Sequence, residues 1–141
     1  MENQPITIER VFDAPVPKIW KALTENEQLK QWYFQLEDFK AEVGFAFQFT
    51  GGPDDRQYLH LCKVTEVIPN QKLTYSWRYD GYPGDSFVTF ELFPEGDKTR
   101  LVLTHTGIET FESFNADFAK GNFVEGWTDI VNVLLKEYLE K

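Results

Sequence analysis

An apolar stripe at the C-terminal end of the chain places the strongest constraint on its fold. The stripe consists of Phe123, Trp127, Ile130, Val131, Leu134, Leu135 and Tyr138. This spacing predicts one face of an α-helix of about five turns, with charged residues such as Glu125, Asp129 and Lys136 on its other faces. A helix with so long an apolar face is stable only when a large apolar surface covers that face. The rest of the chain must provide this surface.

The middle of the chain contains a series of segments in which apolar and polar residues alternate, which is typical of β-strands with one buried face. The segments span residues 6–12, 45–49, 58–68, 73–79, 87–93 and 99–105, with a weaker candidate at 36–43. Turn residues separate them, as in Gly81-Tyr-Pro-Gly84 and Glu95-Gly-Asp97. The spacing predicts an antiparallel meander joined by hairpins, followed by a loop with a helical turn over residues 107–122.

Two short helices are predicted between the first strand and the meander. Asp13-Ala-Pro-Val-Pro17 interrupts the strand pattern, and Pro17 suits a first helical turn because its missing N–H would be unpaired there anyway. The apolar residues of these helices are Ile19, Trp20 and Leu23 in the first and Leu29, Trp32 and Tyr33 in the second, which is predicted over residues 27–33.

These elements predict an α+β fold in one domain, residues 1–141, because the length suits a single core. A strongly curved antiparallel sheet would wrap around the long C-terminal helix, and the two short helices would plug one end. Because such a sheet seldom closes perfectly around a helix, the architecture leaves room for an internal cavity.

Composition excludes several classes of partner. The net charge is −9 and the pI about 4.7, so the protein repels phosphate groups, and we expect no binding to nucleic acid or to an anionic membrane. No apolar run reaches the length of a membrane span and the N-terminus does not resemble a signal peptide, which predicts a cytoplasmic location. The single cysteine, Cys62, excludes an internal disulfide and a Cys-rich metal site. Either a monomer or a homodimer is compatible with the sequence.

No catalytic constellation is evident. His105 shares its strand face with Leu101 and Leu103, so it either anchors a ligand in an apolar interior or bonds a neighbouring group in the core. His60 can face either side of its strand. Two histidines do not make a zinc site, and no neighbour in the sequence marks Cys62 as a nucleophile. We therefore expect no catalytic residue, metal or cofactor, and we favour a protein that is not an enzyme.

Aromatic side chains, 16% of all residues, are the remaining signal. The rings that share one strand face are Tyr75, Trp77 and Tyr79 in one strand and Phe45, Phe47 and Phe49 in another. Such rings either fill the core beneath the helix or line a pocket, because Tyr and Trp bury an apolar body and still offer a directed hydrogen bond. Core packing is the favoured interpretation for Phe90 and Trp127. Both interpretations stay open for Phe47, the two tyrosines and His105.

Motifs along nearly the whole chain match, in order, those of a known superfamily. They are Val11-Phe-Asp-Ala-Pro-Val-Pro-Lys-Ile-Trp-Lys-Ala-Leu-Thr24, Leu29-Lys-Gln-Trp-Tyr33, Leu73-Thr-Tyr-Ser-Trp-Arg-Tyr79, Val88-Thr-Phe-Glu-Leu92, Thr99-Arg-Leu-Val-Leu-Thr-His-Thr-Gly107, and Gly126-Trp127 at the start of the final helix. In this order they resemble the SRPBCC superfamily, the START-like helix-grip proteins that include the birch-pollen allergen. Within it, the chain is most similar to the branch named after the C-terminal domain of the heat-shock-protein-90 ATPase activator.

The resemblance implies an antiparallel sheet of six or seven strands that grips the C-terminal helix, with a hydrophobic cavity between them and two short helices closing one side. It also implies a protein that binds a hydrophobic or aromatic small molecule in that cavity. Two alternatives remain: a co-chaperone-like domain that contacts a chaperone in the stress response, and a cyclase- or hydrolase-type enzyme that uses the cavity. The residues expected to line the cavity are Trp32, Phe47, Tyr75, Trp77, Tyr79, Phe90, His105, Trp127 and Val131.

Overall fold

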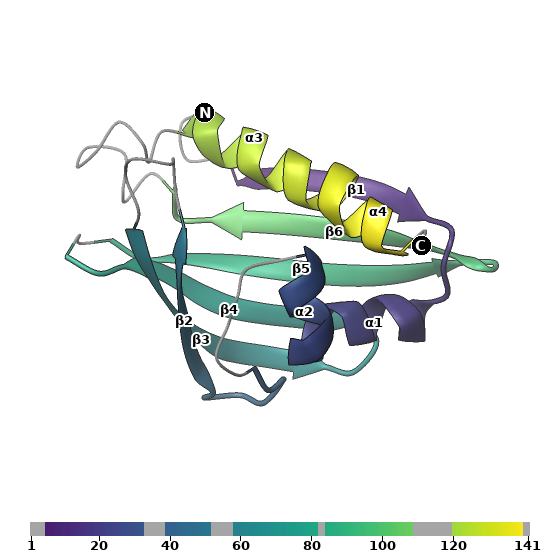
Figure 1. Cartoon of the computed structure of the whole chain (residues 1–141), viewed down its shortest axis with the longest axis horizontal. Coiled ribbons are helices and arrows are strands. Elements are labelled where there is room, and N and C mark those ends of the chain that lie inside the picture. The colour runs from purple at the N-terminus through teal and green to yellow at the C-terminus, as the bar shows by residue number, and fades with distance from the viewer. Residues whose placement is uncertain (1–4, 33–38, 52–57, 82–83, 109–119, 140–141) are drawn as a thin grey trace.

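Six antiparallel strands form the single sheet of the computed structural model, which describes residues 5–32, 39–51, 58–81, 84–108 and 120–139 (Figure 1). The strands are β1 (Ile6–Phe12), β2 (Ala46–Gly51), β3 (Tyr58–Ile68), β4 (Lys72–Tyr79), β5 (Ser86–Glu95) and β6 (Lys98–Thr106). Their order is β1-β6-β5-β4-β3-β2, which confirms the predicted meander and adds β1 beside β6. The weaker candidate at 36–43 forms no strand over residues 39–43, and residues 36–38 lie outside the described residues.

Local backbone features fit the strands into a curved sheet. The pairing of β3 with β4 shifts between Val64 and Glu66, a bulge that bends and twists the strand. Asn70 turns the chain into β4 with a φ of 63°, a conformation that asparagine tolerates better than most residues. Gly107 follows β6 with a φ of 86°, and a Cβ there would lie 2.6 Å from the carbonyl oxygen of Asp85. Only glycine fits this approach between β6 and the start of β5.

Helices α1 (Val16–Thr24) and α2 (Asn26–Trp32) confirm the two short helices predicted after the first strand. Pro17 lies in the first turn of α1, where the helix makes no use of its missing N–H. The indole N–H of Trp32 donates a buried hydrogen bond of 2.9 Å to the carbonyl oxygen of Ala22. This bond ties the end of α2 to α1, so the two helices present their apolar residues as one unit.

The C-terminal helix is not the uninterrupted α-helix that the apolar stripe predicted. It consists of α3 (Lys120–Asp129), a π-helical segment η3 (Ile130–Leu135) and α4 (Lys136–Leu139). Its buried residues are Phe123, Trp127, Val131, Leu135 and Leu139, each four positions after the last. The prediction that Leu134 belongs to the buried stripe was wrong, because 44% of its surface is exposed.

The π-helical segment explains this change of pattern. In an α-helix, residues four apart are rotated by about 40° with respect to one another, so a strict four-residue repeat drifts around the helix. The wider turn of a π-helix rotates each residue less and reverses the drift. Val131, Leu135 and Leu139 therefore stay on one face, and Leu134 turns outward.

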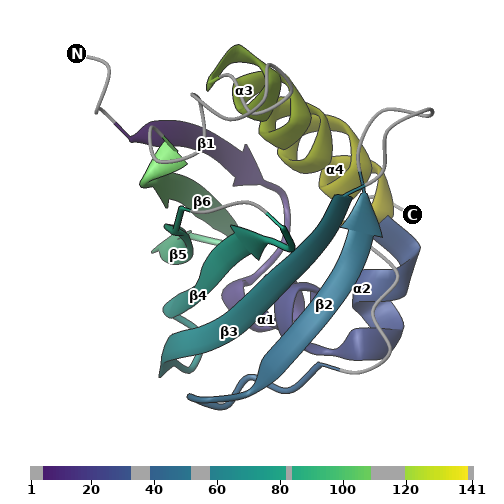
Figure 2. The ribbon, with the colours of Figure 1, turned by 90° about the vertical axis from the view of Figure 1, so that its left-hand side faces the viewer.

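The helices all pack on the same face of the sheet. In Figure 2 the sheet curves around this face, with the C-terminal helix along one side and α1 and α2 along another. This arrangement confirms the α+β helix-grip fold. Within the described residues, no helix is long and apolar enough to cross a membrane.

Candidate functional site

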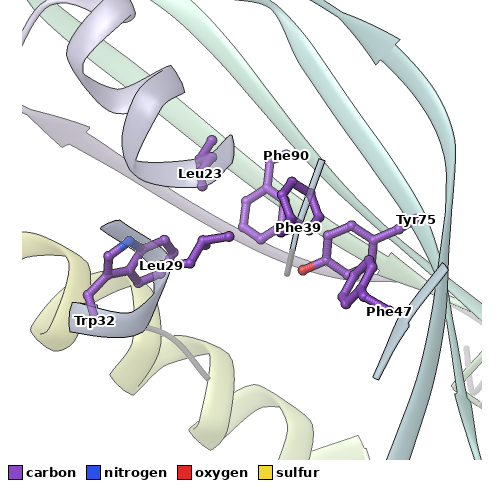
Figure 3. A pocket seen from close by; sticks show the side chains of 7 residues that line it. All are labelled: Leu23, Leu29, Trp32, Phe39, Phe47, Tyr75 and Phe90. Atoms are coloured by element: carbon purple, nitrogen blue, oxygen red, sulfur yellow. The ribbon is translucent and has the colours of Figure 1, made fainter. Parts of the chain in front are cut away.

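A small pocket lies between the helix-covered face of the sheet and the two short helices. The described side chains that line it are Leu23, Leu29, Trp32, Phe39, Phe47, Tyr75 and Phe90 (Figure 3). None of these seven residues carries a charge. The space left between them is about 10 Å³, roughly enough for one water molecule. In this conformation the protein's own side chains fill the pocket.

Regular elements position most of this lining. Leu23 comes from α1, Leu29 and Trp32 come from α2, and Phe47, Tyr75 and Phe90 come from β2, β4 and β5. The three strand residues face the same way because each lies at a buried position of an alternating strand. Phe39 differs from the other six because it belongs to no helix or strand.

The rings around the pocket meet mainly edge to face. The centroid of Phe47 lies 5.1 Å from that of Phe39 and 5.0 Å from that of Tyr75, with ring planes at 78° and 81°. Tyr75 in turn lies 6.1 Å from Phe90. These are favourable geometries, since the positive edge of one ring meets the negative face of the next. The lining rings therefore pack against one another and occupy most of the space between them.

A second ring cluster lies between the sheet and the C-terminal helix. It consists of Phe49, His60, Trp77, Tyr79, His105, Phe123 and Trp127, all buried. His60 stacks on Phe49 with ring centroids 4.5 Å apart, and Trp77 lies 5.3 Å from Trp127. The Trp77 indole N–H donates to the Tyr79 hydroxyl oxygen at 2.9 Å. Within this cluster Trp77 and Tyr79 thus bond to each other, whereas Nδ1 of His60 lies 2.9 Å from the backbone carbonyl oxygen of Tyr58.

His105 is the centre of a hydrogen-bonded chain that crosses this second cluster. Its Nδ1 atom accepts a hydrogen bond of 3.0 Å from the indole N–H of Trp127. Because an acceptor nitrogen carries no proton, the Nε2 atom holds the ring's hydrogen and donates it to the Ser86 hydroxyl oxygen at 2.8 Å. Ser86 then donates to the carbonyl oxygen of Trp77 at 2.8 Å. This series of hydrogen bonds joins the C-terminal helix to β6, β5 and β4, and it provides a partner for each nitrogen of the His105 ring.

Burial keeps both histidines neutral. Desolvation lowers the pKa of His105 to about 3. It also lowers the pKa of His60 to about 4, although the backbone carbonyl of Tyr58, 2.9 Å from Nδ1 of His60, opposes the shift. The charged form of either ring would lose its hydration without gaining a nearby carboxylate among the described residues.

This geometry does not suit acid–base chemistry. In a Ser–His pair that activates a nucleophile, the serine hydroxyl donates to the imidazole. Here the imidazole donates to Ser86, and its other nitrogen is engaged by Trp127. Burial also raises the pKa of the Cys62 thiol, which makes it a poor nucleophile. Among the described residues, no group of three or more His, Cys, Asp or Glu side chains is placed to hold a metal ion.

The structure divides the residues predicted to line a cavity into two groups. Trp32, Phe47, Tyr75 and Phe90 line the small pocket, whereas Trp77, Tyr79, His105 and Trp127 belong to the second ring cluster, and Val131 is fully buried on η3. Three pocket residues were not predicted: Leu23, Leu29 and Phe39. The apolar periodicity of the short helices could have indicated the two leucines. Phe39 lies in the weaker strand candidate at 36–43, which forms no strand over residues 39–43.

A family model matches most of the chain. The model for "Activator of Hsp90 ATPase homolog 1-like protein" aligns with residues 13–140. A curated relative from mouse, "Activator of 90 kDa heat shock protein ATPase homolog 2", is 25% identical over 113 residues, which cover 79% of this chain and 32% of the relative. The chain thus spans about a third of the curated relative that it matches.

Solved structures share the whole fold. The solution structure of Bacillus halodurans protein BH1534 is 30% identical, with a TM-score of 0.72 and coverage of 95% of both chains. The crystal structure of protein MLL2253 from Mesorhizobium loti is 27% identical, with a TM-score of 0.78 and coverage of 97% of both chains.

Proposed function

The chain belongs to the family of Activator of Hsp90 ATPase homolog 1-like proteins, and from this premise we propose that it binds an uncharged, apolar small molecule between the curved sheet and the helices packed on it. The observation that carries the proposal is the pocket under α1 and α2, which is lined by rings and aliphatic side chains. Ligand pockets in proteins are mostly apolar with a few placed polar groups. The Tyr75 hydroxyl supplies such a group, and Figure 3 shows it on the pocket side of its ring.

A ligand screen tests the proposal directly. The purified chain is titrated with uncharged compounds that range from single-ring aromatics to fatty alcohols and flavonoid-like polycycles, and the midpoint of thermal unfolding is recorded. A ligand present at a hundred times its Kd should stabilise the fold by about 2.7 kcal/mol. If no compound changes either the unfolding midpoint or the NMR spectrum at millimolar concentration, the proposal fails.

The Tyr75 hydroxyl allows a matched control within this screen. Tyr75→Phe should weaken ligands that carry a hydrogen-bonding group and leave pure hydrocarbons unaffected. Tyr58→Phe makes the same chemical change at a half-buried tyrosine that is not among the lining residues, so it should alter neither class. Equal effects of the two changes would place the ligand elsewhere.

A second candidate is a contact with a chaperone of the 90 kDa heat-shock class. Its support is the family and the name of the mouse relative, of which this chain corresponds to about a third. The expected result is that the purified chain changes the chaperone's ATPase rate and that backbone NMR signals shift on its addition. An unchanged rate together with unchanged signals would exclude this role for the chain by itself.

A further inference from the structure

A surface groove at one end of the sheet lies apart from the pocket. Its volume is about 650 Å³, and it is bounded by the start of α1, the turn between β3 and β4, and the last residues of β5. In Figure 1 the β5–β6 hairpin projects past this turn. The groove shares no lining residue with the pocket, and its volume lies in the range of small-molecule sites.

The groove occupies the place where β4 would otherwise continue beside β5. Lys72, the first residue of β4, pairs with Glu91, whereas the residues of β5 after Glu91 pair with β6 alone. The Leu92 N–H donates to the Gln71 carbonyl oxygen at 2.9 Å. The Gln71 N–H does not return this bond, because it donates to the carbonyl oxygen of Ile68 at 2.9 Å. The Leu92 carbonyl is therefore left without its partner in the ladder.

This edge of β5 offers hydrogen-bond acceptors and no donor. The backbone groups of a strand point to the same side at every second residue, so the carbonyls of Leu92 and Pro94 both face the groove. The Leu92 N–H is already bonded to the turn, and proline has no N–H. The two carbonyls lie about 6.6 Å apart along the strand, since each residue advances it by about 3.3 Å.

The charged side chains at the groove leave one carboxylate uncompensated. Nζ of Lys72 lies 3.1 Å from Oε1 of Glu66, which balances its charge. The Glu91 carboxylate forms no ion pair or hydrogen bond with any described residue, although Glu91 lies directly across from Lys72 in the ladder. The protein as a whole has a net charge of −9. The groove therefore favours a cation over an anion.

Most of the other lining residues are apolar: Val16, Pro17, Ile68, Leu92, Phe93 and Pro94. Ile68 and Phe93 are large side chains with 39% and 38% of their surfaces exposed. The Arg100 guanidinium lies 4.8 Å from the centroid of the Phe93 ring and donates to Glu95 at 2.9 Å. These contacts fix the ring at the rim, and Glu95 balances the charge of Arg100. The groove thus combines an apolar wall with a row of acceptors.

We propose that this groove binds a small organic cation, an ammonium or guanidinium group carried on an aryl or alkyl body. Such head groups have only donors, which match the two β5 carbonyls and the Glu91 carboxylate. The apolar body would lie against Phe93 and Ile68. A second copy of the chain does not suit the groove, because it would bring the same net negative charge. The site is separate from the pocket, so its test does not depend on the pocket's ligand.

The first test uses four ligands that share one phenethyl body. Phenethylguanidine, phenethylamine, N,N,N-trimethylphenethylammonium and 2-phenylethanol are titrated into the chain at low ionic strength, and the amide NMR signals of Asn70, Gln71 and Phe93 are followed. The first two ligands should bind. The trimethylated cation keeps the charge but has no N–H, so it should bind at least about threefold more weakly, which corresponds to the loss of one hydrogen bond. The uncharged alcohol should be the weakest of the four.

Equal affinities for all four ligands would overturn the proposal, since the groove would then recognise only the apolar body. The absence of any shift at these signals with millimolar phenethylguanidine would also overturn it. The same head groups occur on Lys and Arg side chains of proteins. An Arg- and Phe-containing peptide that shifts these signals while every small cation fails would likewise overturn the proposal, because the groove would then be a docking site for a protein.

The second test changes the charges around the groove one at a time. Glu91→Gln should weaken phenethylamine binding about threefold, within the range of exposed ion pairs. Lys72→Gln should have the opposite effect, because it removes the positive charge nearest the carboxylate. Glu125→Gln is the matched control, since Glu125 is exposed on α3 and does not line the groove. It should leave the affinity at the wild-type value. Equal weakening in Glu91→Gln and Glu125→Gln, or none in Glu91→Gln, would overturn the assignment of Glu91.

Discussion

His105 shows how one polar residue can be accommodated at the centre of an apolar core. The ring is fully buried, and a buried polar group without a partner costs free energy comparable to a lost hydrogen bond. Here Trp127 and Ser86 form hydrogen bonds with the two ring nitrogens, and the Ser86 hydroxyl in turn donates a hydrogen bond to the backbone of β4. These bonds make His105 a link between the C-terminal helix and the sheet.

Trp127→Phe should show how much the hydrogen bond between Trp127 and His105 contributes to the free energy of unfolding. The substitution keeps an aromatic ring in the core but leaves Nδ1 of His105 as a buried acceptor without its donor, which should cost about 1–3 kcal/mol of unfolding free energy. Trp20→Phe is the control, because Trp20 is half-buried and its indole N–H has no partner among the described residues. Urea denaturation measures both. Equal losses in the two variants would mean that the hydrogen bond contributes nothing specific.

Among the elements, the π-helical segment η3 is the one that departs most from regular structure. π-turns are rare, and they commonly arise where a helix holds one residue more than a regular register needs. The buried series from Trp127 to Leu139 advances by fours. Removing one residue between Val131 and Leu135 would convert the spacings to four, three and four, which suits a regular α-helix.

Deletion of Val133 should therefore be tolerated. Val133 is 44% exposed, and its loss lets Val131, Leu135 and Leu139 lie on one face of a continuous α-helix. We expect an unfolding free energy within about 1 kcal/mol of the wild type, together with loss of the π-type hydrogen-bond pattern in NMR spectra.

Insertion of one alanine after Val133 is the opposite change and the control for the deletion. It rotates Leu135 and Leu139 away from the sheet, so that their apolar surfaces become exposed. The expected loss is about 1.5–3 kcal/mol for each side chain. A deletion as damaging as the insertion would show that the π-turn is needed for packing and is not a tolerated extra residue.

For the molecule as a whole, the parts that sequence could predict are those governed by strict periodicity. Apolar and polar residues alternate along the strands, and the turns between the strands are short. The alternation identifies the buried face of each strand, and it therefore also places Tyr75 and Phe90 inside. The side of β3 on which His60 lies could not be predicted, because Leu59 and Leu61 make the opposite face apolar as well. Four-residue spacing does not distinguish a π-turn from an α-helix. Phe39 lies in the weak strand candidate at 36–43. Because residues 39–43 form no strand, its place in the pocket depends on tertiary packing that the alternation did not predict.

The two buried histidines give the whole fold a dependence on pH. In the folded chain His105 and His60 have pKa values of about 3 and about 4, whereas an unfolded histidine has a pKa of about 6.5. Above pH 7 neither state binds these protons, so the free energy of unfolding does not depend on them. Below about pH 6.5 these two histidines bind protons in the unfolded chain but not in the folded chain. The free energy of unfolding therefore falls as the pH falls.

We expect the histidine contribution to fall by up to about 2.7 kcal/mol per pH unit between pH 5.5 and 4, since each site contributes about 1.36 kcal/mol per unit. Urea denaturation at half-unit steps measures the slope. His60→Phe keeps a ring against Phe49 and removes one titrating site, so the histidine share of the slope should halve even though the variant is less stable at every pH. The slope depends on the protons taken up on unfolding and is independent of the packing that the substitution removes. An unchanged slope in His60→Phe would therefore mean that His60 already binds its proton in the folded state.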